Sequence, residues 1–332
     1  MNNSGLIMKI LQTVKKVPGG MMVVPLLLGI LVNTLCPKLL QMGGLTTSLW
    51  GPGAAGTGIA ITMFCVGSQI NVRQAGEVLK RGIVLTLAKF LAGAVVGILI
   101  GKIFGLGGIL GISSLAIVSS VTNSNGGLYM SLAATYGSPE DVGANSILSI
   151  NDGPFLTMLA FGLSGMANIP FISLVAAILP VFVGMILGNI DRDIAEFLKP
   201  GGAILIPFFA FSLGSGISVA NLVSGGVRGI ALGLFCVVWS GFVCILADKF
   251  INKRPGYAGA AIATAAGNCV ATPKIIAEVS PIFAPYVESA TVQCAAAVVV
   301  TVILVPILTA TVAKIWGNNE EFEKRKVASK AS

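Results

Sequence analysis

The chain has 332 residues, of which 55% are hydrophobic and only 10% are charged, and its formal net charge is +8. A soluble protein carries about 25% charged residues, so the composition excludes an ordinary soluble domain. Apolar runs of about twenty residues match the thickness of a bilayer, whereas a transmembrane barrel would show alternating segments of about ten residues.

In chain order, the apolar runs predict an all-α polytopic membrane protein with ten transmembrane helices, at 20–36, 51–70, 83–105, 110–136, 141–164, 168–188, 201–219, 229–248, 257–279 and 285–313. Lysines before the first run resemble the start of a signal peptide, but no A-x-A cleavage site follows. With ten alternating spans, sixteen Lys and Arg fall on the side of both termini and three on the other. This bias predicts cytoplasmic termini, and it explains the basic charge without a nucleic-acid partner.

The commonest metal ligand and proton shuttle of enzyme sites is missing. The sequence contains no histidine, and its six cysteines show no C-x-x-C spacing. No P-loop, H-E-x-x-H or G-x-S-x-G motif occurs either. We therefore expect reduced cysteines, no bound metal, no cofactor and no enzymatic activity.

The two halves of the chain repeat each other. The segment 64–83 (FCVGSQINVRQAGEVLKRGI) matches the segment 211–230 (FSLGSGISVANLVSGGVRGI) at a constant offset of 147. Separately, VPLLLGILVNTL (24–35) resembles LPVFVGMILGNI (179–190). The chain is therefore read as two five-span units, and an odd number of spans places the second unit upside down in the membrane. Inverted repeats of this kind are typical of secondary transporters.

The fourth predicted span is interrupted by the polar stretch SSVTNSNGGLYMS, residues 119–131. Its repeat partner, the ninth span, contains ATAAGNCVATPKIIAE, residues 263–278. Unwound backbone inside a bilayer is costly unless it lines a cavity or finds partners, so both spans are predicted to be discontinuous helices that meet at the bilayer centre. Thr272 is expected to be the N-cap of the second half-helix, with Pro273 at its first position.

Two helix N-termini that converge form an anion site. The predicted binding site for a small anionic, hydroxyl-rich solute comprises Thr122, Asn123, Ser124, Asn125, Gly126, Gly127, Asn268 and Thr272. The structural alternative is a Pro/Gly kink in which Ser and Thr bond to their own helix.

Ionisable residues within spans are functional candidates. Asp152 lies near the middle of the fifth span beside Asn151, and both are assigned to proton or ion coupling. Lys274 either attracts the anion or extends its ammonium outward to the interface, and Lys89 is expected to do the latter or to form a structural pair.

Two further segments are expected to have structural roles or no specific role. Gly93, Gly97, Gly101 and Gly105 form a stripe of every fourth residue on the third span, which permits close helix packing. The terminal GNNEEFEKRKVASKAS is polar and is expected to be disordered.

Several stretches also resemble a known family. MKILQTVKKVPGGMMVVPLLLG, SSVTNSNGGLYMSLAATYG, NDGPF and GYAGAAIATAAGNCVATPKIIAE are similar to segments of the bacterial 2-keto-3-deoxygluconate permeases, and the resemblance runs over nearly the whole chain. It implies proton-coupled uptake of a sugar acid across the bacterial inner membrane and a fold similar to the bile acid/sodium symporters. That fold implies panel helices in 1–70 and 166–220, core helices in 71–165 and 221–316, and discontinuous fourth and ninth helices that cross, and the polar tail at 317–332 follows the core.

The residues themselves leave the coupling ion open between H⁺ and Na⁺, because Asn, Thr, Ser and carbonyl oxygens would also suit sodium, whereas an acid within a span favours H⁺. The oligomeric state is also open. A passive channel would explain ten spans but not paired breaks in inverted repeats. A membrane-embedded enzyme lacks a nucleophile–base pair or metal cluster. The sequence therefore favours a transporter, whose partners are a small sugar acid and the lipid bilayer.

Overall fold

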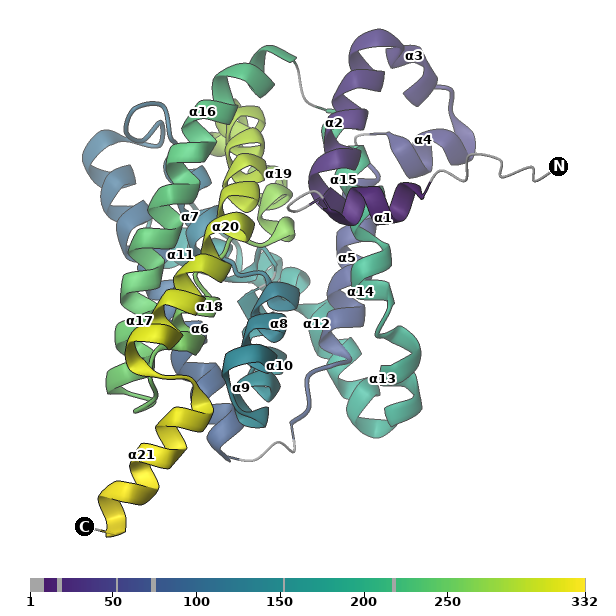
Figure 1. Ribbon diagram of the computed structural model, residues 1–332. Helices are drawn as coiled ribbons and strands as arrows, with labels where there is room; N and C mark the ends of the chain where they lie inside the picture. The colour runs from purple at the N-terminus through teal and green to yellow at the C-terminus, as the bar shows by residue number, and fades with distance from the viewer. Residues whose placement is uncertain are drawn as a thin grey trace, which may run out of the picture.

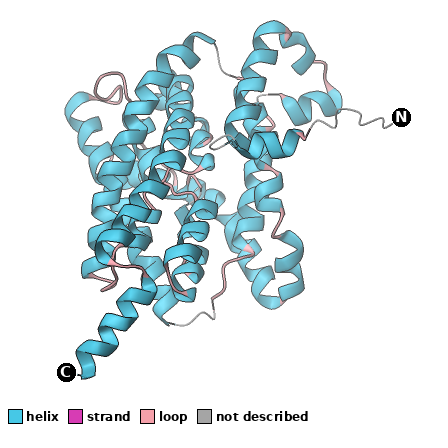
Figure 2. Cartoon of the chain, viewed as in Figure 1, coloured by secondary structure: helices cyan, strands magenta, loops and turns pink. Residues whose placement is uncertain are grey.

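The computed structural model describes residues 9–16, 20–51, 53–72, 76–151, 153–216 and 219–331. These residues form helices and connecting loops, and the only β-type pairing among them is one isolated bridge between Ile109 and Ile112 (Figure 2). An all-helical chain is expected in a bilayer, because a helix satisfies its backbone hydrogen bonds within one segment.

The helices gather into two bodies (Figure 1). One body contains α1 (Ile10–Lys16), α2 (Gly20–Leu35), α3 (Pro37–Leu40), α4 (Gly44–Trp50), α5 (Ala55–Gly67), α12 (Phe171–Ile190), α13 (Arg192–Leu198), α14 (Gly201–Ile204) and α15 (Ile206–Gly214). Within it, α2 packs on α15 and α5 packs on α12. Helices far apart in sequence therefore build this body.

The second body contains the remaining elements. These are α6 (Gly76–Phe104), α7 (Ser114–Thr122), α8 (Gly126–Tyr136), α9 (Pro139–Gly143), α10 (Asn145–Leu148), η1 (Ser149–Asn151), α11 (Phe155–Leu163), α16 (Val219–Phe235), the π-helical turn η2 (Cys236–Ser240), α17 (Gly241–Phe250), α18 (Tyr257–Ala261), η3 (Gly267–Val270), α19 (Thr272–Val279), η4 (Pro281–Tyr286), α20 (Val287–Trp316) and α21 (Asn319–Ala331). The most extensive packing in this body joins α16 to α20 and α6 to α7.

Several helices are suited to a membrane. In the part of the chain that the structure describes, five helices are long and apolar enough to cross a bilayer, or up to seven if each of two bent helix pairs is one span. A shorter apolar helix runs from Val24 to Leu35. The predicted fourth and ninth spans are each broken into short pieces. The chain is therefore an integral membrane protein, while the count of ten spans stays a prediction.

Glycines let the helices of the first body approach closely. A Cβ atom added at Gly184 would lie 2.0 Å from the carbonyl oxygen of Phe64, and one added at Gly29 would lie 2.2 Å from that of Phe211. Neither gap admits a side chain, so both helix pairs depend on glycine.

We expect Gly184→Val to lower the free energy of unfolding by about 1–3 kcal/mol, the usual cost of overpacking. Gly226→Val is the matched control, because nothing lies within 4 Å of a Cβ placed there. Denaturation of the purified variants in micelles measures the difference. Equal stability of the two variants would contradict the close contact of α12 with α5.

The glycine stripe on α6 is confirmed for three of its four members. A Cβ at Gly93 would lie 2.5 Å from the backbone nitrogen of Thr122, and Gly97 and Gly101 are equally crowded by neighbouring side chains. The prediction is wrong for Gly105, which follows the end of α6 with a φ of +78°. Gly105 therefore permits the chain to turn where the helix stops.

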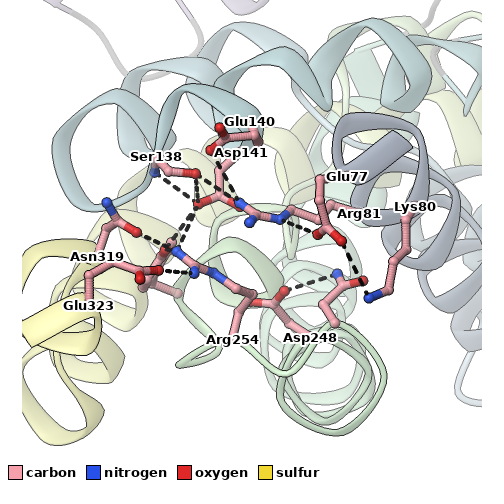
Figure 3. A network of polar contacts seen from close by, with 12 residues as sticks. Glu77, Lys80, Arg81, Ser138, Glu140, Asp141, Asp248, Arg254, Asn319 and Glu323 are labelled. Atoms are coloured by element: carbon pink, nitrogen blue, oxygen red, sulfur yellow. Dashed lines mark hydrogen bonds and ion pairs between the residues drawn. The ribbon is translucent and has the colours of Figure 1, made fainter. Parts of the chain in front are cut away.

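A buried network of charges joins α6, α9 and the segment before α18 (Figure 3). Its centre is the Asp141 carboxylate, which is fully buried and accepts a hydrogen bond of 2.8 Å from Arg81. Tyr257 donates to the same carboxylate at 2.9 Å, and the guanidinium of Arg254 lies 3.8 Å from it. Ser138 donates through both its backbone N–H and its hydroxyl. The network therefore connects α6, α9 and α18 at one end of the second body.

The C-terminal segment is attached to this network, so the expectation of a disordered tail is wrong for its described residues. They form α21, and Glu323 pairs with Arg254 at 2.9 Å. Asn319 accepts a hydrogen bond from the same guanidinium, which also lies over the ring of Phe322. Because Arg254 is a tertiary partner, the composition of the tail alone could not reveal the helix.

Candidate functional site

The break in the fourth predicted span lies where the polar stretch predicted it. Helix α7 ends at Thr122 and α8 begins at Gly126. Asn125 is the N-cap of α8, and its side-chain oxygen accepts a hydrogen bond from the N–H of Leu128 at 3.0 Å. An amide at this position satisfies one of the free N–H groups of the first turn.

The break in the ninth span is longer. Helix α18 ends at Ala261, residues 263–266 are not helical, and η3 begins at Gly267. The prediction that Thr272 is an N-cap is wrong. Ala271 occupies that position, and the Thr272 hydroxyl donates back to the carbonyl of Asn268 at 3.3 Å. The 3₁₀ turn η3 leads almost directly into α19, so the helical path of the chain begins before Thr272.

The two breaks contact each other directly. The backbone N–H of Asn125 donates to the hydroxyl of Thr264 at 2.7 Å. The N–H of Ala265 donates to the hydroxyl of Thr301 on α20 at 3.0 Å. Threonine hydroxyls therefore provide partners for the unwound backbone, which is the requirement for irregular chain at membrane depth.

A cavity of about 520 Å³ lies between the two bodies beside these breaks. Of the predicted site residues, Ser124, Asn125, Gly126, Gly127 and Asn268 line it. Other polar side chains in its lining were not predicted, namely Lys15, Thr62, Gln69, Asn145, Ser149 and Lys199.

Three predicted residues do not line this cavity. Thr122 is buried and donates to the carbonyl of Val118 at 2.7 Å. Asn123 is buried and donates to the carbonyl of Ser119 at 2.8 Å. Thr272 bonds within its own segment. For these three side chains, the hydrogen bonds are those of the structural alternative, in which polar residues satisfy their own helix.

The electrostatics of the cavity favour an anion. Lys15 and Lys199 line it, and no Asp or Glu is among its described lining residues. Lys199 lies 3.3 Å from Glu196, so its charge is partly balanced. The N-terminus of α8 adds the partial positive charge of unpaired N–H groups. Asn145 adds a buried side-chain oxygen with no hydrogen-bond partner among the described residues, an acceptor that suits a hydroxyl of the solute rather than its anionic group.

The coupling residues predicted from the sequence are only partly described. Asp152 lies outside the described residues. Asn151 is buried, and its side-chain oxygen accepts a hydrogen bond of 3.1 Å from Ser124, which lines the cavity. One side chain therefore separates Asn151 from the cavity.

The two lysines within spans differ. Lys274 is half-buried and is not among the residues that line the cavity. Lys89 is fully buried, so its ammonium does not reach the interface, and of the two expected roles its contacts fit the structural pair. Its neighbours are the hydroxyl of Ser240 and the thiol of Cys236.

We expect Asn125→Ala to weaken binding of an anionic solute by roughly thirtyfold, because it removes a cavity amide and the cap of α8, each typically worth about 1 kcal/mol. Thr135→Ala is the control, since Thr135 lies on the same helix but is exposed and bonds only to Ser131. Ligand titration of both purified variants measures the effect. Equal affinities would remove Asn125 from the site.

Comparisons with known proteins agree on one family. The model of the family described as 2-keto-3-deoxygluconate permease matches residues 11–318. A relative named 2-keto-3-deoxygluconate permease 1, from Salmonella typhimurium, is 47% identical over 317 residues, which covers 96% of this chain and 99% of the relative. Relatives named 2-keto-3-deoxygluconate permease from an Enterobacter species and from Bacillus subtilis are 42% and 40% identical. They cover 94% and 92% of this chain, and 95% and 94% of their own lengths are matched.

Proposed function

The chain belongs to the 2-keto-3-deoxygluconate permease family, and from that premise we propose that it imports 2-keto-3-deoxygluconate across the bacterial inner membrane by proton symport. The cavity between the two bodies is the main observation that supports this proposal, because amide groups, lysines and the start of α8 all line it. The family is one of permeases, so a transport role takes precedence over an enzymatic one.

The proposed substrate has the chemistry that this cavity favours. Its carboxylate suits the N–H groups at the start of α8, which begins with Gly126 and Gly127. Its hydroxyl groups suit side chains that both donate and accept, such as Asn125, Asn268 and Ser124 in the lining. An anion with several hydroxyls would therefore use both features of the site.

We further propose that the fold is a pair of inverted five-span repeats. Contacts that occur in equivalent places support this reading. Gly184 on α12 packs against Phe64 of α5, and Gly29 on α2 packs against Phe211 of α15. Phe64 and Phe211 are partners at the offset of 147, and Gly29 and Gly184 are partners in the first-span alignment.

Some partners in the repeat also contact each other. Trp239 donates to the carbonyl of Ala92 at 2.9 Å, and Lys89 lies 3.5 Å from Cys236. Both pairs are separated by 147 residues, the repeat offset. Residues that meet their own counterparts are expected near a two-fold axis, which supports a symmetric crossing of α6 with η2.

The mechanism that follows is alternating access. The body with α5 and α12 would serve as the panel, and the body with the broken helices would serve as the core that carries substrate. The charge bias assigns both termini to the cytoplasm. Asp152 and Asn151 are the proposed coupling residues, on the basis of their place in the fifth span.

The test is uptake of radiolabelled 2-keto-3-deoxygluconate into proteoliposomes with and without an imposed pH gradient, in buffer free of sodium. We expect accumulation above the external concentration only with the gradient. Equilibration without accumulation would indicate a passive channel. Accumulation that needs sodium instead of the pH gradient would replace proton symport with sodium symport.

A further inference from the structure

The amine of Lys89 is buried inside the second body. The residue has no exposed surface, although it is one of the most strongly hydrated side chains. Its Nζ donates to the Ser240 hydroxyl at 2.8 Å and lies 3.5 Å from the Cys236 sulfur. No carboxylate in the described part of the chain lies within ion-pair distance of it.

The acids on elements that pack against α6 already have other partners. On α9, Asp141 bonds to Arg81, and Glu140 lies 3.8 Å from the same guanidinium. On α17, Asp248 accepts from Asn252 and from the N–H of Gly259. The other ionisable groups on these elements are Cys236 on η2, and Cys244 and Lys249 on α17. No ionisable side chain occurs on α7, α10, α11 or η1.

Lys89 is connected to the two helix breaks through the thiol of Cys236. The sulfur of Cys236, beside the ammonium, is 3.9 Å from the carbonyl oxygens of both Ser120 and Ala263. Ser120 belongs to the last turn of α7, and Ala263 follows the end of α18. One turn along α6 from Lys89, Gly93 packs against the backbone of Thr122. The Cys236 thiol therefore contacts both the ammonium and the carbonyl ends of the two half-helices, which carry partial negative charge.

In transporters with broken helices, such carbonyl ends coordinate the coupling cation, while the N-terminal ends face the anionic substrate. We infer that the Lys89 ammonium takes this cation position permanently, so that the protein carries a built-in counter-charge for its anionic substrate. The inference rests on the proposed function, and it identifies a positioning residue that acts through the helix breaks. A buried charge is costly to retain, and an anion bound nearby is what would offset that cost.

Two consequences follow. Substrate binding should not require sodium, because the ammonium already occupies the cation position. Removing the charge should weaken binding of the carboxylate by about tenfold, the effect expected for a unit charge about 10 Å away in a protein interior.

The experiment measures affinity of the purified full-length protein for 2-keto-3-deoxygluconate in sodium chloride and in choline chloride. For wild type we expect equal affinity in the two salts. Lys89→Met should lose about tenfold, whereas Lys102→Met, which removes a lysine from the exposed end of the same helix, should not change. Lys89→Ala leaves room for a small cation, so added methylammonium should restore much of its affinity and choline should not.

A purely structural lysine would not respond to methylammonium. Unchanged affinity in Lys89→Met, or no recovery in a folded Lys89→Ala, would overturn the inference. If neither variant folds, the wild-type protein decides, because sodium-dependent binding would overturn the inference while leaving transport intact. Absence of binding by wild type in both salts would instead contradict the proposed function and, with it, this inference.

Discussion

Asp141→Ala should be among the most destabilising substitutions in this protein, with an expected loss of about 3–5 kcal/mol in the free energy of unfolding. The change removes the carboxylate on which Arg81 and Arg254 converge, and both arginines are buried. Tyr257 loses its acceptor as well. Breaking a buried ion pair from one side is costly because the remaining charge stays desolvated.

Chemical denaturation in micelles measures this loss. The matched control is Glu320→Gln on α21, which breaks an ion pair of 2.6 Å with Lys324 between two exposed side chains. Exposed ion pairs contribute little to stability, so Glu320→Gln should have the same free energy of unfolding as wild type. If both variants have the same stability, the network of Figure 3 does not hold the second body together.

Asp152→Asn should abolish accumulation of substrate driven by a pH gradient. In the ten-span prediction, Asp152 is the only carboxyl near the middle of the membrane, and the chain has no histidine that could replace it. Asparagine keeps the shape and the hydrogen bonding of the protonated acid but cannot release a proton. The variant should therefore bind substrate and exchange it across the membrane, without concentrating it.

Proteoliposome uptake under a pH gradient without sodium, together with counterflow exchange, separates these steps. Glu278→Gln makes the same chemical change on an exposed carboxyl of α19 and should leave accumulation intact. Wild-type accumulation by Asp152→Asn would move the coupling proton to another group. Loss of binding in that variant would make Asp152 a substrate or structural contact instead.

Local patterns in the sequence were sufficient to locate the helix breaks and part of the cavity lining. The polar stretch around Asn125 and Gly126 identified the interruption between α7 and α8, since glycine and a capping amide act within a few residues of their own positions. The same reasoning failed at Thr272, where the turn at η3 begins the helical path earlier. A capping residue and a proline permit a helix start but do not require one.

The composition and periodicity of the chain by themselves determined that this is a helical membrane protein, because hydrophobic length and charge bias reflect the bilayer directly. The tertiary structure decided which polar groups meet. Lys199 reaches the cavity of Asn125, Arg254 meets Asp141, and Lys89 is buried against Ser240. The last two contacts join residues more than one hundred positions apart. Hydropathy assigns such residues to a side or a depth of the membrane, whereas their partners depend on how the helices pack.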